Sequence, residues 1–390
     1  MRKFLYNIQQ IMPLVHNTHL PAVIFALAFL GFHLYGNIAE QSMLTLHWTF
    51  FALVLCNLFV LTYFNQRTTF FYILSILCSY ILINLFKQNY SLDYLSSPAY
   101  LNLCFFIPIN LLCFNFYPKQ KLKTISTIYW LLAIFAEYTC AEQFTRRNIS
   151  PIINFSTDSI NLNSISVYLF ILLLTCTFIR MVKSGTILDS ALFWSNLNIF
   201  SGFYYSSSAT ALCIFFCAAT FTTLVAVLKN IYFTTYTDMV TGLGSRNAYL
   251  KQAPNFPLKY SLGIICIDKY HHFKHIFGQS NINLITSMIA QRMQDIESEC
   301  QFYRYGEDTF VLIFKNEDKN KSFERMENLR RAIASSEFIF NKHRKGLKLT
   351  VSGCVSEKKR SDDNSLEVLY RAHKALQKTY QFTQNVTSKA

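Results

Sequence analysis

Long apolar runs follow one another through the first 235 residues, and this feature limits the possible folds of the chain more than any other. A helix needs roughly 20 mainly apolar residues to cross the hydrocarbon core of a bilayer. Eight runs approach this length, and we interpret each as a transmembrane helix: residues 20–38, 46–64, 69–86, 99–117, 124–139, 165–182, 186–203 and 209–228. We therefore predict a polytopic α-helical membrane region over residues 1–229.

The distribution of charge divides the chain at the same place. Through Thr235 there are 12 Lys and Arg against 6 Asp and Glu, whereas the remaining 155 residues carry 24 against 16. A charge-poor first part followed by a part of ordinary charge density excludes a single soluble enzyme and a disordered chain. Eight of the 11 cysteines lie in the apolar runs, and no CxxC pair or zinc spacing occurs. We expect a soluble second part in a reducing compartment.

Basic residues between the apolar runs predict the orientation, because cytoplasmic loops carry an excess of Lys and Arg. With eight spans and an inner N-terminus, eight basic residues fall on inner segments and three on outer loops. The inner set is Arg2, Lys3, Arg67, Lys119, Lys121, Lys123, Arg180 and Lys183. This predicts a multi-pass protein whose C-terminal domain is cytoplasmic. If residues 186–203 do not span, the N-terminus moves outside.

Four polar residues lie within or beside the predicted spans and have two interpretations each. In one interpretation Asp189 and Glu137 are functional, because a carboxylate is costly in hydrocarbon. In the other they lie near the ends of their spans, where their side chains reach water. His33 and His47 flank the first outer loop, where they either bind a metal or haem or serve as interfacial side chains. The stimulus of a sensor in this region cannot be read from these residues.

The remaining residues alternate between helical and strand patterns. We predict a connecting helix at 230–237 and a domain at 238–390, with strands at 262–267, 301–305, 309–314 and 347–355. Helical stretches follow the first strand through residue 293 and recur at 322–334 and 365–382. Strands and helices mixed in this way predict a ferredoxin-like or palm-like α+β sandwich.

Five blocks in this domain resemble the GGDEF family, the diguanylate cyclases of bacterial cyclic di-GMP signalling. TDMVTGLGSRNAYL at 237–250 resembles the D-x-L-T-G-L-x-N-R opening, and CIDKYHHFKHIFGQSNIN at 266–283 resembles D-I-D-H-F-K-x-I-N-D-x-Y-G-H-x-x-G-D. LTVSGCVS at 349–356 and RAHKALQKTYQFTQN at 371–385 resemble later blocks. RYGEDTF at 304–310 resembles R-Y-G-G-D-E-F, with the signature residues Gly306, Glu307, Asp308, Thr309 and Phe310. The resemblance implies a location in the bacterial inner membrane.

The resemblance also implies a metal site, and the sequence departs from it. Condensation of two GTP molecules requires divalent cations, which prefer carboxylate oxygens. The family carboxylate that ends the first strand is replaced here by Cys266. Asp308 keeps the third signature position, but the acid of the fourth is Thr309 and the second glycine is Glu307. Asp268 matches a mostly structural acid, for which we expect a helix N-cap role.

Residues at the nucleotide-binding positions of the family differ as well. Lys274 stands at the guanine-contacting asparagine, and Asn283 stands at the guanine-contacting aspartate. The lysine and arginine that hold phosphate in the family fall at Tyr380 and Gln384. The product-inhibition motif R-x-x-D is absent, and Glu297 and Cys300 occupy its place.

These departures predict a membrane-anchored GGDEF-family protein with a degenerate, catalytically inactive cyclase site that acts as a sensor, regulatory or interaction module. The domain would pair with itself or with another GGDEF-family protein, and residues 209–236 would pass the signal to it. The alternative is a weakly active diguanylate cyclase that uses magnesium and GTP through Asp308 and Asp268. A third possibility is nucleotide binding without turnover.

Charge and aromatic content indicate which partners other than proteins to expect. The basic cluster at 341–348 touches anionic lipid headgroups or forms a solvated loop. Aromatic residues gather mainly in the membrane half, so we expect membrane lipid and no nucleic acid as a partner.

Overall fold

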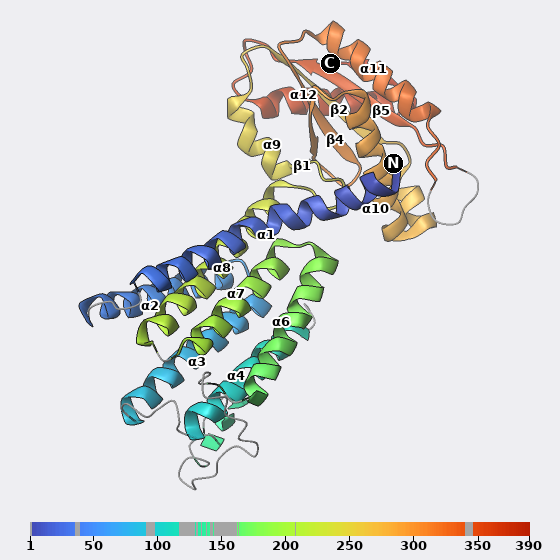
Figure 1. Cartoon of the computed structure of the whole chain (residues 1–390). Coiled ribbons are helices and arrows are strands. Elements are labelled where there is room, and N and C mark those ends of the chain that lie inside the picture. The colour runs from blue at the N-terminus through green and yellow to red at the C-terminus, as the bar shows by residue number, and fades with distance from the viewer. Residues whose placement is uncertain are drawn as a thin grey trace. The chain divides into compact units, whose positions relative to one another are not determined.

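The computed structural model divides into two compact units, Met1–Ile231 and Tyr232–Ala390 (Figure 1). It describes residues 2–35, 40–90, 98–116, 162, 164–206, 208–339 and 346–390, together with isolated positions between 129 and 143. Most of the predicted span at 124–139 and most of the basic cluster at 341–348 therefore lie outside the described residues.

The N-terminal unit is helical. Its helices are α1 (Arg2–Tyr35), α2 (Glu40–Tyr63), α3 (Arg67–Tyr90), α4 (Pro98–Phe116), α6 (Ser164–Ser184), α7 (Ile187–Tyr204) and α8 (Ala209–Tyr236). Five helices in the described part of the chain are long and apolar enough to cross a membrane: Val15–Leu34, Ser42–Tyr63, Arg67–Leu85, Ile165–Ser184 and Thr210–Tyr236. α4 has a shorter apolar stretch, Cys104–Cys113, and α7 does not belong to the five.

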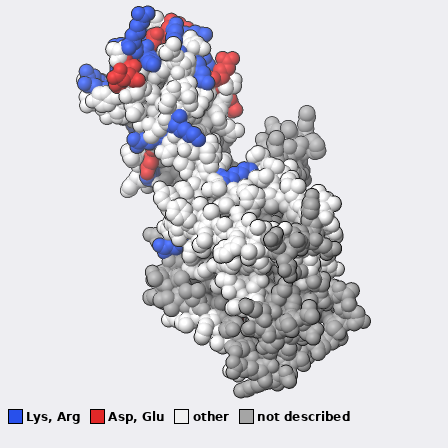
Figure 2. Space-filling view, turned by 90° about the vertical axis from the view of Figure 1, so that its left-hand side faces the viewer, with Lys and Arg blue, Asp and Glu red and all other residues white. Residues whose placement is uncertain are grey.

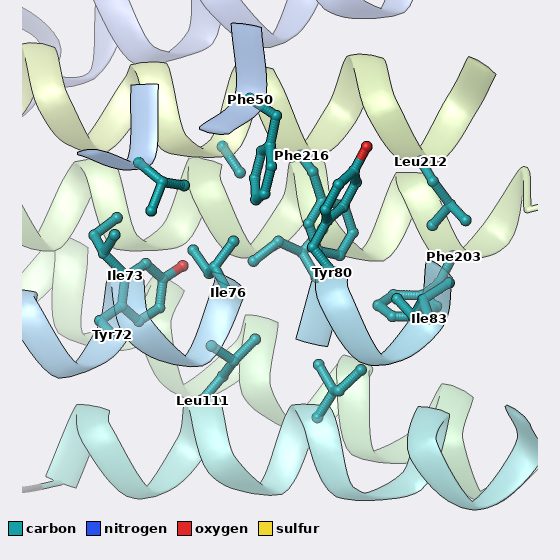
Figure 3. Close-up of a cluster of buried hydrophobic side chains, with 14 of the residues drawn as sticks. Phe50, Tyr72, Ile73, Ile76, Tyr80, Ile83, Leu111, Phe203, Leu212 and Phe216 are labelled. Carbon is teal, nitrogen blue, oxygen red and sulfur yellow. The ribbon is translucent and has the colours of Figure 1, made fainter. Parts of the chain in front are cut away.

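Aromatic side chains form the core of this helical unit. Phe50 of α2, Tyr80 of α3 and Phe216 of α8 are almost fully buried and pack ring against ring (Figure 3). Large apolar side chains also cover its outside, where Phe59 is 72% exposed and Tyr168 is 71% exposed. The face in Figure 2 accordingly shows few coloured charges on the helical unit and many on the C-terminal unit. A surface of this kind suits contact with lipid rather than with water.

Several polar groups inside the helical unit are paired. Arg180 Nε of α6 lies 2.7 Å from an Asp189 carboxylate oxygen of α7, and the Asp189 side chain is only 4% exposed. Thr186 caps α7 and donates a hydrogen bond of 2.7 Å to the same carboxylate. Asn110 Nδ2 donates to Glu137 Oε2 at 2.7 Å. Asp189 and Glu137 therefore have specific partners within the unit.

The C-terminal unit is an α+β domain. After α8 its elements are β1 (Gly244–Ser245), α9 (Arg246–Gln252), a 3-10 helix (Ala253–Asn255), β2 (Tyr260–Ile267), α10 (Tyr270–Ile296), β3 (Gln301–Arg304), β4 (Thr309–Lys315), α11 (Lys319–Ser335), β5 (Val351–Glu357), α12 (Ser365–Tyr380) and β6 (Thr387–Lys389). In the described residues one mixed sheet has the order β1-β3-β4-β2-β5-β6. β2 pairs antiparallel with both β4 and β5, whereas the two outer pairs, β1–β3 and β5–β6, are parallel.

Helices cover both faces of this sheet and create two cores (Figure 1). Because side chains alternate along a strand, Leu262 and Ile264 of β2 join one core, and Ile265 and Ile267 join the other. The first core includes residues of α9 and α12, and the second includes residues of α10 and α11. The α+β sandwich that the sequence predicted is thus confirmed.

The structure differs from the predicted elements in three places. The last long strand begins at Val351 rather than at residue 347, because Leu347 forms only an isolated bridge with Phe338. α10 contains a kink at Gly278, whose φ of 77° is a conformation that favours glycine. The short outer strands β1 and β6 were not predicted, because strands of two and three residues are too short to show an alternation of apolar and polar side chains.

The Arg180–Asp189 pair generates a prediction about the stability of the helical unit. Asp189→Asn keeps the shape of the side chain but removes the charge that Arg180 faces, so we expect a loss of about 1–3 kcal/mol. Thermal unfolding of the full-length protein in detergent measures this loss as a lower Tm. Lys183→Gln, at an exposed position on α6 near Arg180, is the control and leaves the Tm unchanged. An equal Tm for Asp189→Asn and the wild type would contradict a structural role for the pair.

Candidate functional site

Two residues at the predicted metal positions face each other across neighbouring strands. Cys266 near the end of β2 is directly opposite Thr309 at the start of β4, and Cys266 Sγ lies 3.4 Å from Thr309 Oγ1. Burial raises the pKa of the Cys266 thiol to about 12, and the hydrogen bond with Thr309 lowers it only in part. The thiol is therefore protonated at physiological pH, and this strand end presents a neutral pair.

The carboxylate of Asp308 stands beside that neutral pair. Thr309 Oγ1 donates to Asp308 Oδ1 at 2.8 Å, and Asp308 lines a pocket of about 540 Å³. The same pocket is bordered by Cys266, by Lys269 at the start of α10, and by His373, Gln377 and Tyr380 of α12. The α12 residues recur at helical spacing, so one face of that helix forms a wall of the pocket.

Asp268 lies close to this strand end, but its carboxylate is used inside the fold. It is only 2% exposed and accepts hydrogen bonds from Thr350 (2.6 Å), Ser352 (2.7 Å) and the backbone N–H of Asn385 (2.9 Å). The expected N-cap role is wrong, because Lys269 occupies the cap of α10 and makes no side-chain cap bond. The carboxylate instead joins the end of β2 to β5 and to the segment before β6.

Lys274 and Glu307, predicted separately from the sequence, form one ion pair. Lys274 Nζ of α10 lies 2.6 Å from Glu307 Oε2 in the signature turn, and both side chains are accessible to solvent. The hydrogen bond from Lys274 lowers the pKa of Glu307, and the hydrogen bond to Glu307 raises the pKa of Lys274. The pair therefore connects the two predicted nucleotide positions directly.

The other predicted nucleotide positions also have contacts within the domain. Asn283 accepts a hydrogen bond of 2.8 Å from Gln279 on the exposed side of α10. The Tyr380 hydroxyl accepts a hydrogen bond of 3.2 Å from the backbone N–H of Lys269, whose own φ is 54°. Gln384 is exposed and lies after the end of α12.

An arginine that sequence reasoning missed holds the signature turn in place. Arg304 Nη1 is 3.0 Å from Asp238 Oδ1, and Arg304 Nη2 donates to the backbone oxygen of Glu307 at 2.9 Å. Burial acts to raise the pKa of Asp238, but hydrogen bonds from Thr241 and Arg304 outweigh it and hold that pKa below its usual value. Asp238 lies in the opening block and Arg304 lies in the signature block, and only the tertiary structure brings the two side chains into contact.

A second missed arginine occupies the region of Glu297 and Cys300. Arg325 of α11 pairs with Glu297, lies 2.6 Å from Glu317, and contacts Cys300 Sγ at 3.4 Å. Burial raises the pKa of Cys300 to about 12, so this thiol is neutral too. The network ties the end of α10 to α11.

A family comparison agrees with this architecture. The family described as "Diguanylate cyclase, GGDEF domain" matches residues 235–385. Those residues are a GGDEF domain. No curated protein matches the sequence.

Solved structures similar to the chain include other GGDEF proteins. The coiled coil and GGDEF domain of DgcB from Caulobacter crescentus, in complex with c-di-GMP, has 20% identity and a TM-score of 0.38, covering 43% of this chain and 92% of that chain. The FimX GGDEF domain from Pseudomonas aeruginosa has 21% identity and a TM-score of 0.36, covering 40% and 99%. Diguanylate cyclase SiaD from Pseudomonas aeruginosa, with its activator SiaC, has 16% identity and a TM-score of 0.38, covering 66% and 100%.

The contacts of Asp268 predict that it stabilises the domain. Asp268→Asn replaces an acceptor-only carboxylate by an amide beside three donors, so we expect a loss of about 1–3 kcal/mol. Hydrogen exchange in the full-length protein should quicken in β5 and β6. Asp363→Asn, at an exposed position, is the control and leaves exchange unchanged. Unchanged protection in Asp268→Asn would contradict this role.

The burial of Cys266 predicts a thiol of low reactivity. Because only the thiolate is alkylated and the pKa is raised to about 12, iodoacetamide should modify Cys266 slowly near pH 8. The rate should rise with pH toward that value. The same residue in urea-unfolded protein, where the pKa returns to about 8.5, is the control and reacts rapidly. Peptide mass spectrometry measures both rates, and rapid labelling of the folded protein would contradict the neutral thiol.

Proposed function

We propose that this protein is a membrane-anchored GGDEF protein that takes part in cyclic di-GMP signalling by regulation or interaction and does not synthesise the dinucleotide. One observation carries the proposal: Cys266 and Thr309 are opposed across the strands as a neutral thiol and hydroxyl. In the family pattern that the sequence resembles, an active cyclase has acidic residues at these two positions.

The residues at this strand end do not fit a magnesium ion. Magnesium prefers octahedral oxygen ligands, and the family pattern that this sequence resembles provides carboxylates at the strand end and at the third signature position, with a further acid at the fourth. Asp308 offers one, whereas the Asp268 carboxylate is already bound by Thr350 and Ser352. No group of three or more His, Cys, Asp or Glu side chains in the described parts of the chain is arranged to hold a metal ion. We therefore derive no catalytic step through a metal.

The nucleotide positions support the same proposal. A guanine or phosphate group entering beside the signature turn would have to displace the Lys274–Glu307 ion pair. Near α12 the Lys269 backbone N–H, a donor suited to phosphate, is already bonded to the Tyr380 hydroxyl. Cys266, Lys274 and Tyr380 thus each have a partner within the domain, which is expected when a domain keeps its fold without its reaction.

The membrane location rests on the helical unit. Five apolar helices, an apolar outer surface and basic residues on the predicted inner loops favour a multi-pass inner-membrane protein with a cytoplasmic GGDEF domain. We propose that the helical unit receives a signal and that the GGDEF domain acts on a protein partner. A second GGDEF domain, from the same or another chain, is the partner that we favour.

A weakly active cyclase is the rival function, and Asp308 at the border of the 540 Å³ pocket is the observation in its favour. The two functions differ in one measurable product. Full-length protein in detergent, incubated with GTP and magnesium, should form no cyclic di-GMP above a protein-free blank, because one carboxylate remains for the metal.

The variant Asp308→Ala is the matched control for that assay. If the wild type and Asp308→Ala both yield only blank levels, the proposal stands. Product that appears with the wild type and disappears with Asp308→Ala would establish the cyclase and overturn the proposal. Equal amounts of cyclic di-GMP from both proteins would identify a contaminating cyclase. Further purification, continued until the amount of product is low and constant, removes it.

A further inference from the structure

A pocket of about 330 Å³ lies between α2 and α3 of the helical unit. Leu44, His47 and Trp48 of α2 line it at helical spacing, and Tyr80 and Asn84 line it from α3. The volume falls within the range that small-molecule sites occupy. Its lining is mostly apolar and aromatic, includes no charged residue, and contains a few polar groups in one place.

These polar groups meet around the Tyr80 hydroxyl. The side chain of Tyr80 is 1% exposed, and its oxygen lies 2.5 Å from His47 Nδ1 and 3.1 Å from Cys213 Sγ. Asn84 Nδ2 donates to the backbone oxygen of Tyr80 at 2.8 Å. The Tyr80 ring is held by Phe50, at a centroid distance of 4.0 Å, so its hydroxyl has a defined position (Figure 3).

The third member of this polar group belongs to the helix that leads to the GGDEF domain. Cys213 lies one turn inside α8 (Ala209–Tyr236), and its sulfur is 3.8 Å from both His47 ring nitrogens. A molecule that hydrogen-bonds to His47 or Tyr80 therefore changes the surroundings of α8 directly. Polar residues at membrane depth usually serve a function, and this polar group is separate from the GGDEF site, although the Tyr80 ring also packs in the helical core.

The position of the pocket limits what enters it. His47 is near the start of the apolar stretch Ser42–Tyr63, and Leu85 ends the stretch Arg67–Leu85, so the pocket lies at one end of two spans. Leu44 is 60% exposed and Trp48 is 68% exposed, on a surface that suits lipid. A ligand that arrives there is soluble in the membrane, and its polar end is near the water boundary.

We propose that this pocket binds a membrane-soluble quinone. A quinone ring is uncharged and planar, as the lining of Trp48 and other apolar side chains requires, and its carbonyl oxygens accept hydrogen bonds from the imidazole, hydroxyl or amide groups. Its apolar tail remains in the hydrocarbon. A metal does not explain the group, because the described residues contain no set of three metal-binding side chains. The inference rests on the membrane location proposed above.

A photoreactive azidoquinone tests the site in full-length protein embedded in phospholipid nanodiscs. We expect saturable labelling of peptides from α2 and α3 that unlabelled decylubiquinone competes away. Leu44→Trp fills the pocket from its exposed rim without altering the core, and it should weaken labelling about tenfold. Tyr80→Phe removes one hydroxyl and should weaken it to a similar extent.

The matched control is Leu30→Trp, which adds the same side chain at a position on α1 that is 54% exposed. It should label like the wild type. Labelling outside α2 and α3, labelling that does not saturate, or equal labelling of Leu44→Trp and the wild type would each overturn the proposal. A haem absorption band that His47→Phe abolishes would overturn it in favour of haem. Because labelling needs no GTP, its failure is distinguishable from failure of the function proposed for the GGDEF domain.

Discussion

The pairing of β2 with β4 and β5 is the constraint on which the C-terminal domain depends. In this antiparallel register Cys266 lies opposite Thr309 on one side and opposite Ser352 on the other. The same register brings the carboxylate of Asp268 to the hydroxyls of β5 and places Asp308 beside the thiol. A one-residue slip would turn every side chain of β2 to the opposite face and exchange the two cores.

Substituted positions in the domain stabilise one another instead of remaining unpaired. Lys274 contacts Glu307 across the signature turn, and the Tyr380 hydroxyl accepts the N–H of Lys269. Arg325 in turn neutralises the acid that stands in the place of the product-inhibition motif. A buried polar group carries a desolvation cost unless it finds a partner, so these internal pairs help to stabilise the domain.

The helical unit differs, because its surface is largely apolar and its buried polar side chains must find partners inside it. Some are paired, as Arg180 with Asp189 and Tyr72 with Asn196, whose oxygen accepts at 2.8 Å. Others, such as Asn57 Oδ1 and Ser190 Oγ, have no hydrogen-bond partner among the described residues. The group around Tyr80 differs from both, since it borders a pocket and reaches α8. This position is the reason for placing a ligand there.

Local pattern determined the division of the chain, the apolar helices, the alternating strand at 262–267 and the presence of the GGDEF domain at 235–385, because each depends on neighbouring residues or on a contiguous block. Local pattern also identified Cys266 and Glu307 as residues that differ from the GGDEF family pattern. Only tertiary structure decided that Asp268 is buried among donors and that Glu307 is paired with Lys274. Thr350 lies 82 residues from Asp268 along the chain, and Lys274 lies 33 residues from Glu307. The pocket beside Tyr80 likewise requires α2 and α3 to meet, and its polar group also requires α8; no local pattern specifies such a meeting.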